Sequence, residues 1–170
     1  MAKQHQVQAT HLTANQRVFV EGLLGFNRIS SLITGKEREE ANARAARVGS
    51  FQNDYDYTRV VVTDAKIIQG DPAAPTREEF FLIERLYEKD GVQNFSHDNK
   101  SSQLPPVFIQ NDAGQYQLVK DLAGDLASGT PVLLELETYK PKNFPSHGYA
   151  LRRIFIKQKG AVPYRSNASD

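Results

Sequence analysis

The last third of the chain intersperses aromatic and basic residues. No acidic residue occurs between Glu137 and the terminal Asp170, whereas seven basic residues fall in this interval: Lys140, Lys142, Arg152, Arg153, Lys157, Lys159 and Arg165. Aromatic residues stand among them at positions 139, 144, 149, 155 and 164. Cations neutralise phosphates and flat rings stack on unpaired bases, so this composition favours a site for single-stranded nucleic acid. The alternative is an ordinary edge hairpin kept soluble by its charges.

Within this interval we predict stacking and phosphate-binding residues separately. The stacking residues are Tyr139, Phe144 and Tyr149, and the phosphate-binding residues are Lys140, Lys142, Arg152 and Arg153. Pro141 and Pro145 restrict the backbone between them, which would hold the rings ready at little cost in entropy. A second set, Tyr55, Tyr57 and Arg59, alternates along a predicted strand and shares one of its faces. This row is either a further stacking platform or an external solubilised face.

The net charge of +1 conceals an uneven distribution of charge. Residues 138–169 carry +7, which leaves −6 for the rest of the chain. Such asymmetry indicates a basic face on an otherwise acidic body.

Catalytic and metal-binding chemistry finds little support in the sequence. There is no cysteine, and the four histidines, His5, His11, His97 and His147, are not paired at ligand spacing. Ser96–His97 and Ser146–His147 are adjacent pairs outside any nucleophile elbow, and the GLLG run at 22–25 lacks the Lys-Ser/Thr of a phosphate-binding loop. The glutamates at 78, 79, 84 and 88 are interpreted as a solvated helix face. We therefore expect no enzyme, no cofactor and no metal.

The elements that position the candidate residues are mostly strands. Val132, Leu134, Leu136 and Thr138 alternate with polar positions and predict the core face of a strand that enters the basic hairpin. Residues 17–33 predict a long strand that bends or bulges at Gly22 and Gly25. Further strands are expected over 55–69, 107–110 and 116–119, a loop over 94–106, and a mobile loop or short exposed helix over 36–47. Thr76 and Glu79 have capping-box spacing and predict a helix that ends near Asp90, with Phe80, Ile83 and Tyr87 in the core.

The length of 170 residues and the composition indicate one globular domain. We expect a flexible arm over 1–16, the folded domain over 17–159 and a flexible tail over 160–170. No apolar run reaches the length of a membrane span, and the N-terminus lacks a signal-peptide core, so the cytoplasm is the expected location.

Five or six strands, one central helix and a glycine-bent first strand predict a mainly β chain, a small Greek-key barrel of the OB-fold type. The segments VFVEGLLGFNRI, TRVVVTDAKII and VLLELETYKPKNFPSHGYALRRIFI resemble in layout the OB-fold single-stranded DNA-binding proteins of phages and conjugative or mobile elements. The resemblance covers most of residues 17–157. It implies that aromatic and basic residues of the sheet face and hairpin loops hold the DNA strand.

The sequence thus predicts a non-enzymatic, sequence-tolerant single-stranded DNA-binding protein that serves DNA replication, recombination or transfer in a phage or mobile element. The alternative is a protein–protein accessory or structural module that docks the same hairpin on an acidic partner. Binding of RNA, homo-oligomer formation and contacts with replication or transfer proteins stay open.

Overall fold

The computed structural model describes residues 5–50, 52–119, 122 and 124–157. Within them the chain is mainly β, as predicted, with eight strands in one sheet. The strands are β1 (Arg17–Asn27), β2 (Tyr57–Ile68), β3 (Tyr87–Lys89), β4 (Val92–Lys100), β5 (Val107–Gln110), β6 (Tyr116–Val119), β7 (Pro131–Tyr139) and β8 (Gly148–Ile156). The helices are α1 (Gly35–Arg47), α2 (Arg77–Glu84) and a 3-10 turn, η1 (Ala9–His11). Helix α2 is the central helix that was predicted. Helix α1 corresponds to the second of the two alternatives for 36–47, a short exposed helix.

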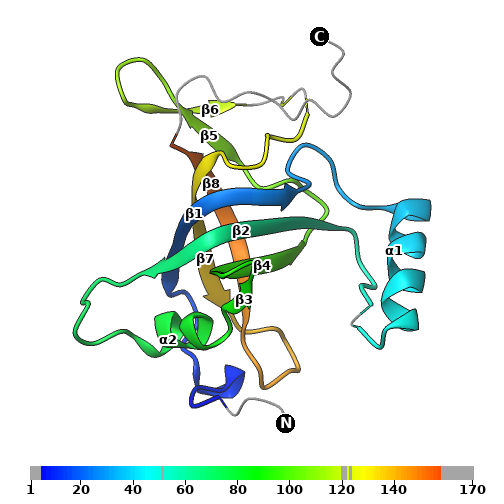
Figure 1. Cartoon of the computed structure of the whole chain (residues 1–170). Coiled ribbons are helices and arrows are strands. Elements are labelled where there is room, and N and C mark those ends of the chain that lie inside the picture. The colour runs from blue at the N-terminus through cyan, green and yellow to red at the C-terminus, as the bar shows by residue number, and fades with distance from the viewer. Residues whose placement is uncertain (1–4, 51, 120–121, 123, 158–170) are drawn as a thin grey trace.

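The strand order is β3-β4-β2-β1-β7-β8-β5-β6, and every neighbouring pair is antiparallel except β5 with β8. In Figure 1 the strands β1, β2 and β4 cross β7 and β8 at a steep angle, so the sheet is strongly curled. The curl brings β4 to β8, where the Asn99 side-chain oxygen accepts a hydrogen bond of 2.8 Å from the Leu151 amide.

The concave side of the curled sheet holds the core. Four alternate residues of β7 face this core and are fully buried: Val132, Leu134, Leu136 and Thr138. The core face predicted for this strand is confirmed. Residues of the other long strands pack against them, among them Val18, Val20, Val60, Val62, Leu151, Ile154 and Ile156.

The glycine bulge predicted in the first strand is confirmed. The register of β1 with β2 shifts between Glu21 and Leu23, around Gly22, and again between Leu24 and Asn27. A Cβ atom on Gly22 would lie 2.6 Å from Val62 Cγ1 and 2.7 Å from the Thr63 carbonyl oxygen. The bend thus brings β1 and β2 too close for any side chain at this position.

Helix α2 begins as predicted and ends earlier. The Thr76 hydroxyl accepts from the Glu79 amide, and the Glu79 carboxylate accepts from the Thr76 amide. The helix ends at Glu84, however, and a tight turn with positive φ at Asp90 and Gly91 joins β3 to β4. Tyr87 consequently lies on β3 with 40% of its surface exposed and is not a core residue.

The loop predicted over 94–106 is wrong for its first half, which forms most of β4. This strand lacks an apolar alternation because two of its buried residues are asparagines. Asn94 donates to the Val92 carbonyl, and Asn99 accepts from β8 and contacts His97. Polar side chains with local partners tolerate burial, and a search for apolar periodicity cannot detect them.

The flexible arm predicted over 1–16 is wrong for its described part, residues 5–16. Val7 and Leu12 are buried, and their segment lies along α2. The Glu84 carboxylate accepts from the amides of Gln6 and Val7, and the Glu78 carboxylate accepts from the Thr13 amide.

The same contacts correct the interpretation of the helix glutamates as a solvated face. Glu78, Glu79 and Glu84 are buried because they satisfy backbone donors, and Glu88 alone is exposed, on β3. The tail predicted over 160–170 lies outside the described residues. In the described part, no helix is long and apolar enough to cross a membrane.

Candidate nucleic-acid interface

Two hollows of the surface are both lined by Lys100, at the end of β4. One, of about 460 Å³, lies towards α1, and the other, of about 370 Å³, lies towards the β7–β8 hairpin. We call them together the β4 groove. The first is lined by Arg38, Asp54, Tyr55, Asp56, Lys100, Ser101 and Ser102, and the second by Asp98, Asn99, Lys100, Tyr139, Tyr149, Ala150 and Arg152.

Two of the predicted stacking residues border this groove on opposite sides. Tyr55 precedes β2 and is 64% exposed, and the Lys100 ammonium lies 5.8 Å from the centre of its ring. Tyr139 ends β7 and is 38% exposed, with its ring directly over Gly148, where a Cβ would lie 2.8 Å from it. Gly148 therefore lets the Tyr139 ring lie against the backbone of β8 with one part still accessible.

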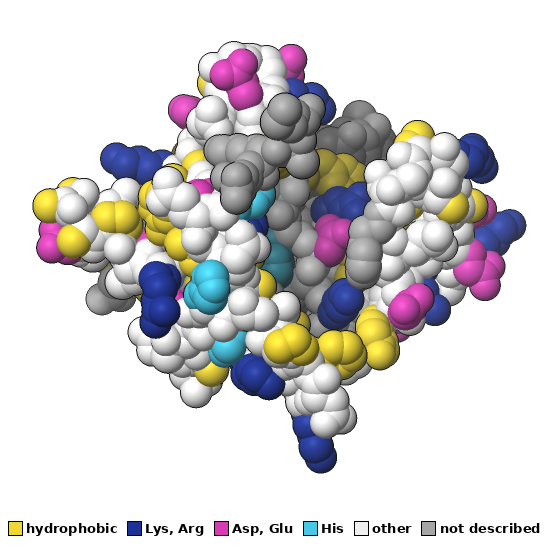
Figure 2. All heavy atoms as spheres, turned by 90° about the horizontal axis from the view of Figure 1, so that it is seen from below, with side chains coloured by type: hydrophobic (Ala, Val, Ile, Leu, Met, Phe, Trp, Pro, Cys, Tyr) yellow, Lys and Arg dark blue, Asp and Glu magenta, His cyan; other side chains and the backbone are white. Residues whose placement is uncertain are grey.

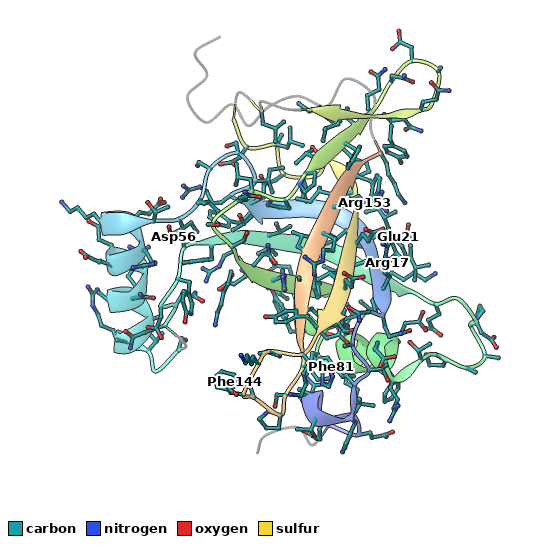
Figure 3. The ribbon with its side chains drawn as sticks, turned by 180° about the vertical axis from the view of Figure 1, so that it is seen from behind. Arg17, Glu21, Asp56, Phe81, Phe144 and Arg153 are labelled. Carbon is teal, nitrogen blue, oxygen red and sulfur yellow. The ribbon has the colours of Figure 1, made fainter. Side chains whose placement is uncertain are left out.

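The loop between β7 and β8 carries three further predicted residues. Lys140, Lys142 and Phe144 are exposed, and Phe144 has 64% of its surface accessible. Figure 3 shows Phe144 at the loop, pointing away from the sheet. Among the ion pairs of the described residues, none involves Lys140 or Lys142.

Tyr149 and Tyr57 are occupied by structural contacts, contrary to the sequence interpretation. The Tyr149 ring stacks on Phe81 of α2 with centroids 5.4 Å apart, and its hydroxyl donates to the Glu78 carbonyl at 2.6 Å. Burial accordingly raises the pKa of the Tyr149 hydroxyl. Tyr57 is only 1% exposed, beneath the α1 side of the sheet, so no base can stack on it.

A Tyr149→Phe variant is expected to lose about 0.5–1.5 kcal/mol of unfolding free energy, the typical net contribution of one hydrogen bond. Its affinity for nucleic acid should match that of the unmodified chain, because the hydroxyl faces α2. Urea unfolding and oligonucleotide binding on the same preparation measure both. A drop in affinity with unchanged stability would return Tyr149 to the binding surface.

The predicted arginines differ in how firmly they are paired. Arg59 forms two hydrogen bonds with Asp98, at 2.7 and 2.8 Å, and Arg153 forms two with Glu135, at 2.8 and 2.7 Å. Arg152 makes one, at 3.0 Å to Glu137, and half of its side chain is exposed. An exposed single contact contributes little, so Arg152 can exchange Glu137 for a phosphate, whereas Arg153 would leave a buried carboxylate behind.

Three of the basic residues that are unopposed in sequence, Arg152, Arg153 and Lys157, are therefore paired in space, whereas Lys159 and Arg165 lie outside the described residues. Glutamates of the neighbouring strands β1 and β7 supply the partners, and Lys157 joins them through Glu21 at 2.6 Å. On the face shown in Figure 2, Lys and Arg side chains are scattered among acidic, hydrophobic and uncharged atoms rather than gathered in one patch. The expected continuous basic face reduces, in the described residues, to the groove and the hairpin loop.

Two carboxylates show the strength of these pairs. Hydrogen bonds from Arg153 hold the pKa of Glu135 below its ordinary value, with burial acting in the opposite direction. Burial also pushes the pKa of Asp98 upward, but the hydrogen bonds and charge of Arg59 outweigh it and the pKa is lowered.

Acid is therefore expected to weaken the fold through Glu135. The pKa of Glu135 is lower in the folded chain than the value of about 4.3 expected in the unfolded chain. The ion pair with Arg153 therefore stabilises the fold fully above that unfolded value, and this contribution is lost as the pH falls through the folded-state pKa. A Glu135→Gln variant should be less stable at neutral pH and lose less on acidification. Urea unfolding at a series of pH values measures this, with exposed Glu88→Gln as the control. Parallel pH profiles for all three proteins would contradict it.

Lys100 is the groove residue that the sequence did not indicate. It belongs to the segment predicted as a loop. Its place on a strand, two residues after Asp98, can be recognised only once β4 is known. Among the described residues, no group of three or more His, Asp or Glu side chains is placed to hold a metal ion.

Comparisons with protein-family models, with curated proteins and with solved structures find no match to this chain.

Proposed function

We propose that the protein binds single-stranded DNA in the β4 groove, without strong sequence preference and without catalysis. The observation that carries this proposal is the placement of two accessible rings, Tyr55 and Tyr139, on either side of Lys100. Rings separated by a cation suit a backbone phosphate between two stacked bases. Lys140, Lys142 and Phe144 extend the same chemistry onto the hairpin loop.

The position of the groove also supports the proposal if the proposed OB-type fold is taken as the frame. OB-type barrels bind oligonucleotides on the face of their second and third strands, between the loops that join strands one and two and strands four and five. With β1, β2, β4, β7 and β8 as the five barrel strands, the β4 groove lies on that face. The α1 segment and the β7–β8 loop then take the places of the two bordering loops. The proposed fold is therefore an OB-type barrel elaborated by α1, α2 and the β5–β6 hairpin.

The DNA event served is replication, recombination or transfer in a phage or mobile element, as the layout resemblance implies. Docking of the hairpin on an acidic protein is the alternative function. It draws support from the extensive pairing of Arg153 and Arg59, which leaves fewer cations for phosphates.

The test compares single-stranded and duplex oligonucleotides of equal length over a range of salt concentrations. Preference for the single strand is expected, because a stacked duplex hides the base faces. If Lys100, Lys140 and Lys142 each contact a phosphate, the salt slope should be about −2, or roughly a twentyfold loss between 50 and 200 mM salt. Lys142→Ala should reduce the slope by somewhat under one, and Lys66→Ala, on β2, should not. Equal affinity for duplex, or a flat salt response, would favour the docking function.

A further inference from the structure

The two edges of the sheet differ in how they are protected. The β3 edge is three residues long, and two of them, Glu88 and Lys89, are charged. The β6 edge, Tyr116–Val119, has no charged residue and exposes half of the Leu118 surface. Charges and short length discourage pairing with another chain, so β3 is a protected edge and β6 is not.

Backbone geometry shows which groups the β6 edge presents. The Asn111 amide donates to the Gln115 carbonyl across the β5–β6 hairpin. Because antiparallel strands alternate hydrogen-bonded pairs, Gln117 also faces β5, while the amides and carbonyls of Tyr116 and Leu118 face outward. Within the described residues β6 pairs with β5 only, and Figure 1 shows this hairpin projecting beyond the crossing strands.

An apolar row leads across the convex surface to the same edge. Leu133 of β7 lies opposite Phe155 of β8, Phe155 lies beside Phe108 of β5, and Phe108 lies opposite Leu118. The rings of Phe108 and Phe155 stack at 5.3 Å, and Tyr116 meets Phe155 edge-on at the same distance. Within the described residues the row ends at Tyr116 and Leu118 of β6, and the Arg153 guanidinium lies 5.2 Å from the centre of the Phe155 ring.

We propose that β6 pairs antiparallel with β6 of a second copy of this chain, about a two-fold axis at Gln117. Side chains of directly opposite residues in such a pair point to the same face of the sheet. Tyr116 must therefore lie opposite a residue whose side chain is on the convex face and whose amide and carbonyl point to the partner strand. This register sets Tyr116 against Leu118 of the copy and Gln117 against its own equivalent, and it joins all the outward amides and carbonyls in hydrogen bonds. The apolar row then continues into the second copy.

The occupant is a second copy because the strand is self-complementary. It has no charge to repel its own equivalent, and its aromatic and aliphatic residues meet each other under the two-fold axis. Four-residue strands bury less area than a standard stable interface, so the dimer should depend on protein concentration.

The absence of cysteine in the chain permits a direct test without DNA. Opposite residues of antiparallel strands have Cα atoms about 4.5–5.5 Å apart, within reach of a disulfide. Gln117→Cys should therefore form a disulfide-linked dimer under mild oxidation, and Glu88→Cys, at the centre of the β3 edge, should stay monomeric. Sedimentation of the unmodified chain should show a dimer that Leu118→Lys weakens at least tenfold. Gln117→Lys serves as a second variant if Leu118→Lys fails to fold by circular dichroism.

Equal cross-linking at positions 88 and 117, or a monomer at all concentrations up to about 100 μM, would overturn the proposal. So would a chain that dimerises only after deletion of residues 158–170, because that result assigns the edge to this segment. None of these outcomes bears on DNA binding, so the dimer and the proposed function can fail separately.

Discussion

The double variant Tyr55→Ala/Tyr139→Ala is expected to bind single-stranded DNA at least about 30-fold more weakly than the unmodified chain. Each stacked base is worth about 1–3 kcal/mol on alanine substitution, and the lower bound for two rings gives this factor. The salt slope should stay nearly unchanged, because neither substitution removes a cation. Titration of a fluorescent oligonucleotide at three salt concentrations measures both quantities.

The matched control is Tyr87→Ala, which removes a ring on β3 that is about as exposed as Tyr139 and does not line the β4 groove. The single variants Tyr55→Ala, Tyr139→Ala and Phe144→Ala show whether the groove or the loop contributes more. Since Tyr139 also lies on Gly148, its alanine variant requires a melting curve. Lower stability with unchanged affinity would mean that the ring serves only to pack the hairpin, and the stacking role would be lost.

Gly22→Ala is expected to destabilise the fold by about 1–3 kcal/mol, the usual cost of overpacking. The added methyl group would lie 2.7 and 2.9 Å from the carbonyl oxygens of Thr63 and Asp64, and backbone atoms cannot turn aside as a side chain can. Relief requires β1 to move away from β2, at the bend that carries the core residues of both strands.

Gly25→Ala is the matched control in the same strand. Its nearest neighbours would be the Thr63 and Val61 side chains at 3.3 and 3.4 Å, a tight contact that small movements can relieve. The remaining strain is offset by the lower entropy of an unfolded chain with alanine, about 0.4–1 kcal/mol. Urea unfolding should thus separate the two variants clearly. Coincident midpoints would show that the bend at Gly22 can relax.

The elements that the sequence predicted well are those whose local signals agree with their tertiary surroundings. In β7, the alternation of Val132, Leu134 and Leu136 corresponds to a strand with one wholly buried face. At Thr76, the capping box is a local hydrogen-bond pattern that needs no distant partner. The glycine bulge was predictable because only glycine permits two backbones to approach so closely.

The remaining elements depend on partners that are distant in sequence. The Gln6 and Val7 amides contact a carboxylate 78 and 77 residues later, and the Asn99 oxygen contacts an amide 52 residues later. Nothing near either residue indicates these bonds. The same reason explains why the basic face was overestimated. Counting charges along the sequence does not show that Arg153 of β8 is paired with Glu135 of the neighbouring strand β7.

The N-terminal segment also bears on how the protein can be trimmed. The Ala9 carbonyl accepts from the His147 amide at 3.0 Å, at the base of the hairpin loop that carries Lys142 and Phe144. Removing residues 1–16 would thus remove a hydrogen bond that supports that loop, and it would also remove the amides that donate to Glu78 and Glu84. Limited proteolysis should spare peptide bonds near Val7 despite their place ahead of the first strand.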